Sequence, residues 1–289
     1  MDFRLTEDQR ALRRGVRELL ARRFDRAALR EAVDTPALDR GLWRELGNAG
    51  FFALRLPEDE GGVGLGLPEA VLLFEEAGRA LLPGPLVATH LAAGTVPGAA
   101  DGTVVVTAAS EGLVPWLDEA DVVSGDVTGA VPLRSVDPLT PLHRLPARTG
   151  AYPAVAGEAV LLHAAEQVGS AGRTTEAAVA YAREREQFGQ VIGGFQAVKH
   201  LCAGMLVRAE LARAAVRAAA VTADPVEIAG AKLLADEAAV GNARDCLQVH
   251  GGMGFTWEAD VHLHLKRAWV RARLGMTAER AEEAVAASL

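Results

Sequence analysis

Two short stretches of this chain gather residue types that can hold an anion against exposed backbone. The first is the run from Gln248 to Thr256, which reads QVHGGMGFT. Glycine has no side chain to block the backbone, so amide groups in such a run can approach an anion closely. Ending a helix takes only one glycine, so the cluster of Gly251, Gly252 and Gly254 favours an anion-binding role over a simple helix stop.

The second stretch lies upstream and combines a guanidinium, an aromatic ring and an amide. Residues 185–189 read REQFG and residues 192–196 read IGGFQ. The planar fork of Arg185 matches phosphate geometry, and Phe188 offers a ring face. Each candidate has an ordinary alternative: Arg185 as a surface arginine in a charged run, Phe188 as a core residue, and Gln196 as a solvated helix start.

Helical periodicity dominates both ends of the chain. Apolar faces at helical spacing predict an N-terminal helical domain in residues 1–96. Longer stripes with charged opposite faces predict a C-terminal four-helix bundle in residues 154–289. Residues 97–153 instead hold β-branched runs punctuated by glycine and proline, which predicts a short β module. The predicted fold class is therefore mainly α.

The bulk composition disfavours several classes of protein. The chain has 289 residues, 50% of them hydrophobic, and a net charge of −8, so nucleic acid is not an expected partner. No apolar run is long enough to span a membrane, and the N-terminus lacks a signal-peptide pattern, so we expect a cytoplasmic protein. The cysteines and histidines lack metal-ligand spacing, so no metal site is expected.

Together the two stretches resemble the FAD-contacting signatures of the acyl-CoA dehydrogenase family. The domain order is similar as well, and so are Asp2-Phe3, Leu56-Pro57-Glu58 and Tyr181-Ala182. The resemblance covers residues 1–95 and 154–270. It implies FAD as cofactor, an acyl-CoA thioester as substrate and an electron-transfer flavoprotein as electron acceptor. In this family the neighbouring subunit contacts the ADP half of each FAD, and that role falls here to Arg185, Phe188, Gln196, Gln248, Gly251, Gly252 and Gly254.

The middle of the chain departs from the family. The usual β-domain is longer and carries Thr-Glu-Pro and Gly-Ser-Asp strings that hold the flavin ring, and neither string is present. The catalytic glutamate is also missing, because the two positions at which the family places it hold Gly275 and Ala159. Glu158 is one residue away, and one step on a helix rotates a side chain by about 100°, so we expect it to point elsewhere.

Glu258 is the carboxylate nearest to the glycine cluster. The reaction removes a proton α to the thioester carbonyl, so a base must lie within hydrogen-bond reach of that carbon. Glu258 is therefore the candidate for a displaced catalytic base. The alternative is that it stabilises the start of the helix that begins near Asp260.

These features lead to one main hypothesis and two alternatives. The chain is expected to be the small subunit of a heteromeric acyl-CoA dehydrogenase whose full-length partner carries the flavin-ring loop and the glutamate. It resembles small actinobacterial-type subunits that act on CoA thioesters of steroid side chains. A homo- or hetero-tetramer is expected, since the alanine-rich C-terminal region permits close helix approach. The alternatives are a complete homomeric enzyme that uses Glu258, and a non-catalytic structural pseudo-subunit.

Overall fold

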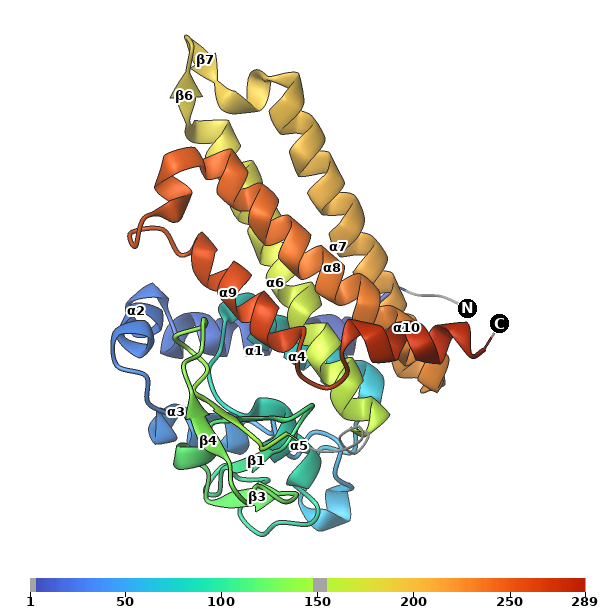
Figure 1. Ribbon diagram of the computed structural model, residues 1–289. Helices are drawn as coiled ribbons and strands as arrows, with labels where there is room; N and C mark the ends of the chain where they lie inside the picture. The colour runs from blue at the N-terminus through green and yellow to red at the C-terminus, as the bar shows by residue number, and fades with distance from the viewer. Residues whose placement is uncertain (1–3, 148–154, 289) are drawn as a thin grey trace.

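The computed structural model describes residues 4–147 and 155–288, and helices account for most of it (Figure 1). The predicted fold class, mainly α, is confirmed. The Asp2-Phe3 pair of the family resemblance and the last residues of the predicted β module lie outside the described residues. The N-terminal region contains the helices α1 (Glu7–Arg23), α2 (Arg26–Asp34), α3 (Arg40–Asn48), α4 (Leu67–Ala80) and α5 (Leu86–Ala92).

The middle of the chain forms short strands that lie within the range expected for the β module. Strand β1 pairs in parallel with β3, and β5 lies between β2 and β4 with antiparallel pairing on both sides. Because each strand is only three residues long, this module depends on neighbouring helices for its position. The strands are β1 (Val106–Ala108), β2 (Leu113–Pro115), β3 (Val122–Ser124), β4 (Val131–Leu133) and β5 (Leu142–Arg144).

The C-terminal region is a bundle of long helices with a small hairpin at one end. The hairpin, β6 (Glu186–Gln187) and β7 (Gln190–Val191), stands at the end of the bundle that is far from the β module (Figure 1). Helix α6 lies at the centre, where it packs against α4, α7 and α8. The helices are α6 (Gly157–Glu184), α7 (Gln196–Thr222), α8 (Pro225–His250), α9 (Val261–Arg271) and α10 (Ala278–Ala286).

Side-chain oxygens explain where several helices begin. Thr6, Asp25 and Asp39 accept hydrogen bonds from backbone amides in the first turns of α1, α2 and α3. Asp224 does the same for α8, where Pro225 occupies the first helical position. Each cap satisfies amides that have no partner within the helix, and proline suits this position because it needs no donor.

Helices α4 and α6 cross at very short range because each has a glycine at the crossing. A Cβ atom on Gly78 would lie 1.9 Å from the backbone oxygen of Glu166, and one on Gly169 would lie 1.8 Å from that of Glu75. No side chain fits at either position. The crossing therefore fixes α6, which carries candidate residues at both of its ends, against the N-terminal domain.

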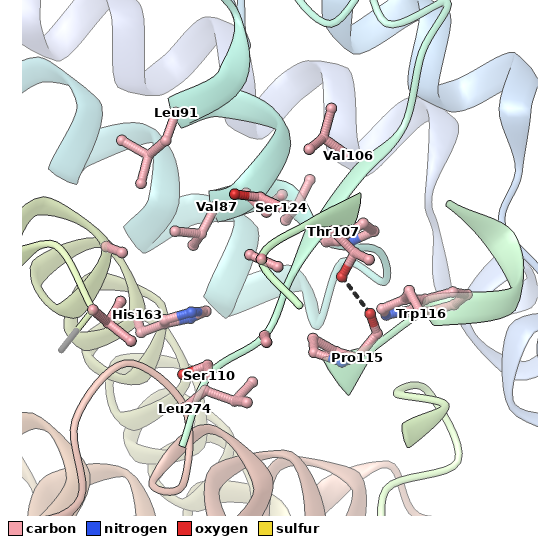
Figure 2. Close-up of a pocket in the computed structure, with 18 of the residues that line it drawn as sticks. Val87, Leu91, Val106, Thr107, Ser110, Pro115, Trp116, Ser124, His163 and Leu274 are labelled. Carbon is pink, nitrogen blue, oxygen red and sulfur yellow. Dashed lines mark hydrogen bonds between the residues drawn. The ribbon is translucent and has the colours of Figure 1, made fainter. Parts of the chain in front are cut away.

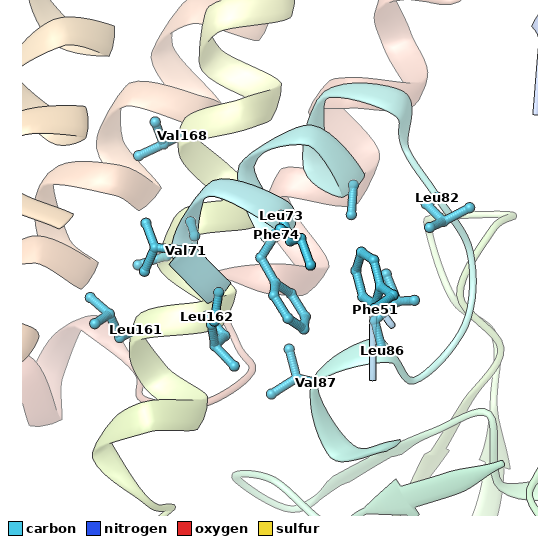
Figure 3. Packing of buried hydrophobic residues seen from close by; sticks show 14 of the residues in the cluster. Phe51, Val71, Leu73, Phe74, Leu82, Leu86, Val87, Leu161, Leu162 and Val168 are labelled. Atoms are coloured by element: carbon cyan, nitrogen blue, oxygen red, sulfur yellow. The ribbon is translucent and has the colours of Figure 1, made fainter. Parts of the chain in front are cut away.

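One hydrophobic core runs through the N-terminal domain into the bundle. Figure 3 shows Phe51 and Phe74 packed together near Leu162 of α6 and Val87 of α5. The rings of Phe51 and Phe74 lie 5.3 Å apart between centroids, and both residues are almost completely buried. This shared core makes the N-terminal domain and the bundle a single packing unit.

A buried arginine ties the β module to the bundle. Arg267 of α9 pairs with Asp137 and donates to the backbone oxygens of Leu82 and Leu139, at 3.1 and 3.0 Å. Arg267 and Asp137 are both buried, and removing either would leave an uncompensated charge. The connection fixes the wall of the cavity that opens between the module and the helices.

Candidate functional site

The hairpin after α6 holds an aromatic ring out in solvent. Its two-residue turn consists of Phe188 and Gly189, with φ of 54° and 79°, which is the backbone of a type I′ turn. Positive φ is unfavourable for a residue with a bulky side chain. Phe188 is nevertheless 92% exposed, and its ring lies edge-on to that of Phe195, at 6.1 Å between centroids. The alternative that Phe188 is a core residue is wrong for this chain.

Arg185 and Gln196 flank the hairpin. Arg185 ends α6 with an exposed side chain that has no ion pair within the described part of the chain, and its backbone oxygen accepts from Ile192 at 2.8 Å. Gln196 is the first residue of α7, and its amide reaches the ring of His200 at 3.2 Å. The guanidinium of Arg185, the ring of Phe188 and the amide of Gln196 therefore all lie on or beside one exposed hairpin.

The glycine cluster ends α8 and leaves backbone uncovered. Gly251 has φ 61° and ψ −141°, and the turn Gly251–Phe255 follows as a 3₁₀ helix. A Cβ atom on Gly251 or Gly252 would meet no atom within 4 Å. No described residue requires glycine at position 252, so the space outside it is open to a ligand. Gln248 lies on the last turn of α8 with an exposed side chain.

Gly254 has a different reason to be glycine. It is buried, and a Cβ atom there would lie 3.0 Å from the Cβ of His250 and 3.1 Å from the backbone oxygen of Leu247. Close packing against Leu247 and His250 is therefore enough to explain a glycine at this position. The predicted backbone contact of Gly254 with a cofactor stays a prediction.

An aromatic stack brings the two stretches to the same end of the bundle. The ring of Tyr181, on the last turn of α6, stacks on that of His250, on the last turn of α8, with 4.2 Å between centroids. The hairpin with Arg185 thus lies at the same end as the glycine cluster. These residues are called the edge site below: Arg185, Phe188, Gln196, Gln248, Gly251 and Gly252.

Glu258 lies between the 3₁₀ turn and α9, in the exposed part of that loop. Its backbone oxygen accepts from Arg26 at 2.6 Å. The N-cap of α9 is Asp260, which pairs with Arg26 and Arg30 and makes no capping hydrogen bond. Glu258 does not border the large cavity of this chain.

That cavity, of about 600 Å³, opens between α5, the first strands, α6 and α9 (Figure 2). Val87, Leu91 and Val106 contribute apolar wall, with Trp116 on the side opposite to His163. It is large enough for a substantial organic ligand.

The two positions where the family places its base meet at this cavity. Ala159 lines it, and Gly275 follows Leu274, which lines it as well. A Cβ atom on Gly275 would lie 3.2 Å from the Cα of Val160 and 3.3 Å from the Cδ2 of His163. Gly275 and Ala159, which are identified by their spacing from two separate motifs, therefore lie at one wall of one cavity.

Glu158 points away from that wall. Both of its carboxylate oxygens accept from Arg55, at 2.7 and 2.8 Å. These hydrogen bonds lower the pKa of Glu158. A carboxylate held ionised by an arginine outside the cavity is a poor candidate for a base within it.

Sequence reasoning missed the titratable groups that do face the cavity. His163 lies one helical turn after Ala159 on α6, and its Nδ1 lies 3.1 Å from an oxygen of Glu166. The other oxygen of Glu166 accepts from Arg271 at 2.7 Å. Burial raises the pKa of Glu166, but Arg271 and His163 outweigh it and the net pKa is lowered. The i,i+3 spacing of a histidine and a glutamate in an apolar helix was the available signal.

Family comparisons match both helical regions. Residues 6–104 match the family model described as the acyl-CoA dehydrogenase N-terminal domain, and residues 158–289 match the acyl-CoA dehydrogenase C-terminal domain. A relative described as acyl-CoA dehydrogenase IpdE2, from Mycobacterium tuberculosis, is 37% identical over 296 aligned residues. The alignment covers 93% of this chain and 93% of that protein.

Several solved structures share this fold. The structure described as the Tcur3481–Tcur3483 steroid ACAD, G363A variant, superposes with a TM-score of 0.85 at 26% identity, covering 97% of each chain. The ChsE4–ChsE5 complex from Mycobacterium tuberculosis gives a TM-score of 0.85 at 23% identity, covering 100% of this chain and 98% of that one. Within residues 4–147 and 155–288, no helix is long and apolar enough to cross a membrane.

Proposed function

Because the chain belongs to the acyl-CoA dehydrogenase family of FAD-dependent enzymes, we propose that it is the small subunit of a heteromeric acyl-CoA dehydrogenase. Its edge site contacts the ADP half of an FAD whose flavin ring is held by a full-length partner. The observation that carries the proposal is the edge site itself. An exposed aromatic ring, an arginine without an ion pair in the described chain and two uncovered glycines lie at one end of the bundle.

The residues fit the ADP half of the cofactor. Arg185 can form a charge-assisted hydrogen bond to a diphosphate, and Phe188 offers a face on which an adenine ring can lie. The amides near Gly251 and Gly252 are open to phosphate oxygens because no side chain covers them. A bound FAD would supply an acceptor for the hydride that leaves the β-carbon of the acyl group.

The distance between the two ends of α6 supports the participation of a neighbouring subunit. His163, at the cavity, and Arg185, at the edge site, are separated by about 33 Å of helix at a rise of about 1.5 Å per residue. The edge site therefore cannot touch reacting atoms in this chain's own cavity. The cofactor that it contacts belongs to an active site formed with another subunit.

Two further features support assembly with a partner. Leu206, Val207 and Leu211 lie on the outside of α7 and are 53%, 65% and 55% exposed. Adjacent exposed apolar residues on one helix are typical of an interface. Two structures that share this fold are a complex of two different proteins and a steroid ACAD described with two components. We infer a hetero-tetramer that acts on acyl-CoA thioesters derived from lipids or steroids, with an electron-transfer flavoprotein as acceptor.

Absorbance spectra of the chain, alone and co-expressed with a full-length family relative from the same organism, test this function. The expected result is a colourless chain alone and a yellow complex that is bleached by acyl-CoA. A chain that is yellow and bleached on its own would instead support a complete homomeric enzyme. A preparation that stays colourless under both conditions would support the structural pseudo-subunit.

A further inference from the structure

The chain's own cavity contains a hydrogen-bonded series of three side chains, called the relay below: His163, Glu166 and Arg271. Glu166 and Arg271 are 4% and 3% exposed, and the pair joins α6 to α9. Burying two charged groups costs free energy. The attraction between Arg271 and Glu166 offsets that cost only while both side chains are ionised. The relay ends at His163, which projects from α6 into the cavity (Figure 2).

The relay fixes the tautomer of His163. The carboxylate of Glu166 is ionised, since its pKa is lowered, so it can only accept a hydrogen bond. Nδ1 of His163 must therefore carry the hydrogen, because it lies 3.1 Å from that oxygen. A neutral imidazole with its proton on Nδ1 has a free lone pair on Nε2. This is the geometry in which a carboxylate orients a histidine as a general base.

Arg271 stays charged and so helps to keep the Glu166 carboxylate ionised. Burial lowers the pKa of Arg271 to about 10, so the guanidinium remains charged at neutral pH. The ionised Glu166 carboxylate lies between Arg271 and His163 in the relay. It can therefore stabilise positive charge that forms on the imidazole during a reaction.

A hydroxyl group lies near the imidazole on the same wall. Ser110 lines the cavity, and its Oγ accepts from the backbone amide of Gly275 at 2.8 Å. Because the Gly275 amide supplies the hydrogen of that bond, the hydroxyl hydrogen of Ser110 remains available for a ligand. A Cβ atom on Gly275 would lie 3.3 Å from the Cδ2 of His163, so the residue that holds the Ser110 hydroxyl also borders the imidazole.

From this geometry, we infer that His163 Nε2 is a proton acceptor in this chain's own cavity, where it takes the α-proton of a bound acyl thioester. The acyl chain lies along the apolar wall, and the hydroxyl of Ser110 donates to the thioester carbonyl. The inference uses the thioester substrate of the proposed function and does not need the edge site. It places an imidazole on the wall where Gly275 and Ala159 supply no carboxylate.

The proton transfer is balanced without an oxidant. The Cα–H bond breaks, its electron pair forms the enolate of the thioester, and the proton moves to Nε2 of His163. Return of the proton restores the thioester. In D₂O the imidazolium exchanges with solvent, so the reverse step delivers deuterium to Cα.

Deuterium uptake by butyryl-CoA measures this step directly. The full chain, purified without a partner, is incubated with butyryl-CoA in D₂O, and the mass of the thioester is followed. We expect uptake by the unmodified chain and a loss of about 10²- to 10⁴-fold in H163Q, the range for removal of a general base. The matched control is H200Q, a histidine exposed on α7 far from the cavity, for which the rate should not change.

A second variant separates chemistry from structure. H163A leaves space where the ring was, so added imidazole should restore uptake if the lone pair of Nε2 is the acceptor. Uptake at the uncatalysed rate with the unmodified chain, full uptake in H163Q, or a loss in H163A that imidazole does not restore would each overturn the inference. FAD occupancy of the assembled complex is the separate readout of the proposed function, and it should be the same with H163Q as with the unmodified chain.

Discussion

At the residue scale, the backbone of Phe188 is the observation that most favours the proposed contact of the edge site with a neighbouring subunit. An aromatic residue with φ of 54° and 92% exposure gains little from packing in its own subunit, where its ring has an edge contact with Phe195. Such conformations persist where the surrounding structure holds them for a function. The neighbouring Arg185 is also exposed and has no ion pair in the described chain, which favours the same proposal.

R185A should therefore weaken retention of FAD in the assembled complex while the fold stays intact. Loss of a charge-assisted phosphate contact costs about 1.5–3 kcal/mol, or roughly 10- to 150-fold in affinity. Flavin absorbance after dialysis measures the effect. R183A, also exposed on the last turn of α6, is the control and should keep its flavin. Equal flavin content in R185A and R183A would refute the proposed contact between Arg185 and FAD.

E258Q should leave the activity of the assembled enzyme within a few-fold of the unmodified enzyme. Glu258 is exposed on the loop before α9 and does not border the cavity, and its described contact to Arg26 uses the backbone oxygen, which the substitution keeps. Steady-state turnover with FAD occupancy measured in parallel tests this. A loss of a hundredfold or more with FAD still bound would make Glu258 the base.

At the element scale, the crossing of α4 and α6 determines where both ends of α6 lie. G169A should destabilise the chain by about 1–3 kcal/mol or more, because the added methyl group would meet the backbone oxygen of Glu75 at 1.8 Å. Urea unfolding measures this. G230A is the matched control: Gly230 is helical and its Cβ would meet nothing within 4 Å, so alanine should stabilise by about 0.5–1 kcal/mol. Similar urea midpoints for G169A and G230A would show that close contact at the α4–α6 crossing does not require Gly169.

The same elements show what sequence alone could and could not predict. Helical periodicity and short motifs predicted the mainly α fold and the edge-site residues, because both signals are local. The relay was missed because Arg271 is far from Glu166 in sequence, and only the packing of α9 on α6 joins them. The packing role of Gly254 was hidden for a similar reason, since it depends on how the 3₁₀ turn folds back onto α8.

At the scale of the whole molecule, buried histidines make the chain sensitive to acid. Burial lowers the pKa of His90 to about 4 and that of His264 to about 3, against an ordinary value of 6.5. Between these values the unfolded chain binds more protons than the folded chain, so stability falls as pH falls from about 6.5 towards 4.

H90Q should therefore reduce the loss of stability between pH 7 and pH 5. The contribution of His90 to that loss is on the order of 2 kcal/mol. Urea unfolding of the two proteins at both pH values is the measurement, and the comparison uses the difference between pH values, so any constant cost of the substitution cancels. An identical pH dependence in both proteins would show that His90 is not responsible.

Exposed apolar residues on α7 indicate that the whole molecule assembles with another subunit. A trans contribution to FAD requires a neighbour, and Val207 and Leu211 present exposed apolar side chains one helical turn apart on α7. An obligate interface is typically apolar at its centre, and burying a charge there without a partner costs several kcal/mol.

V207E should therefore shift the complex towards free subunits and release FAD with them. V131E, at a valine of β4 that is 56% exposed against 65% for Val207, should leave assembly unchanged. Sedimentation velocity at micromolar concentration, with flavin absorbance followed in the same cell, reads both quantities at once. Free subunits that keep their flavin would mean that assembly and cofactor binding are independent, which the edge site does not permit.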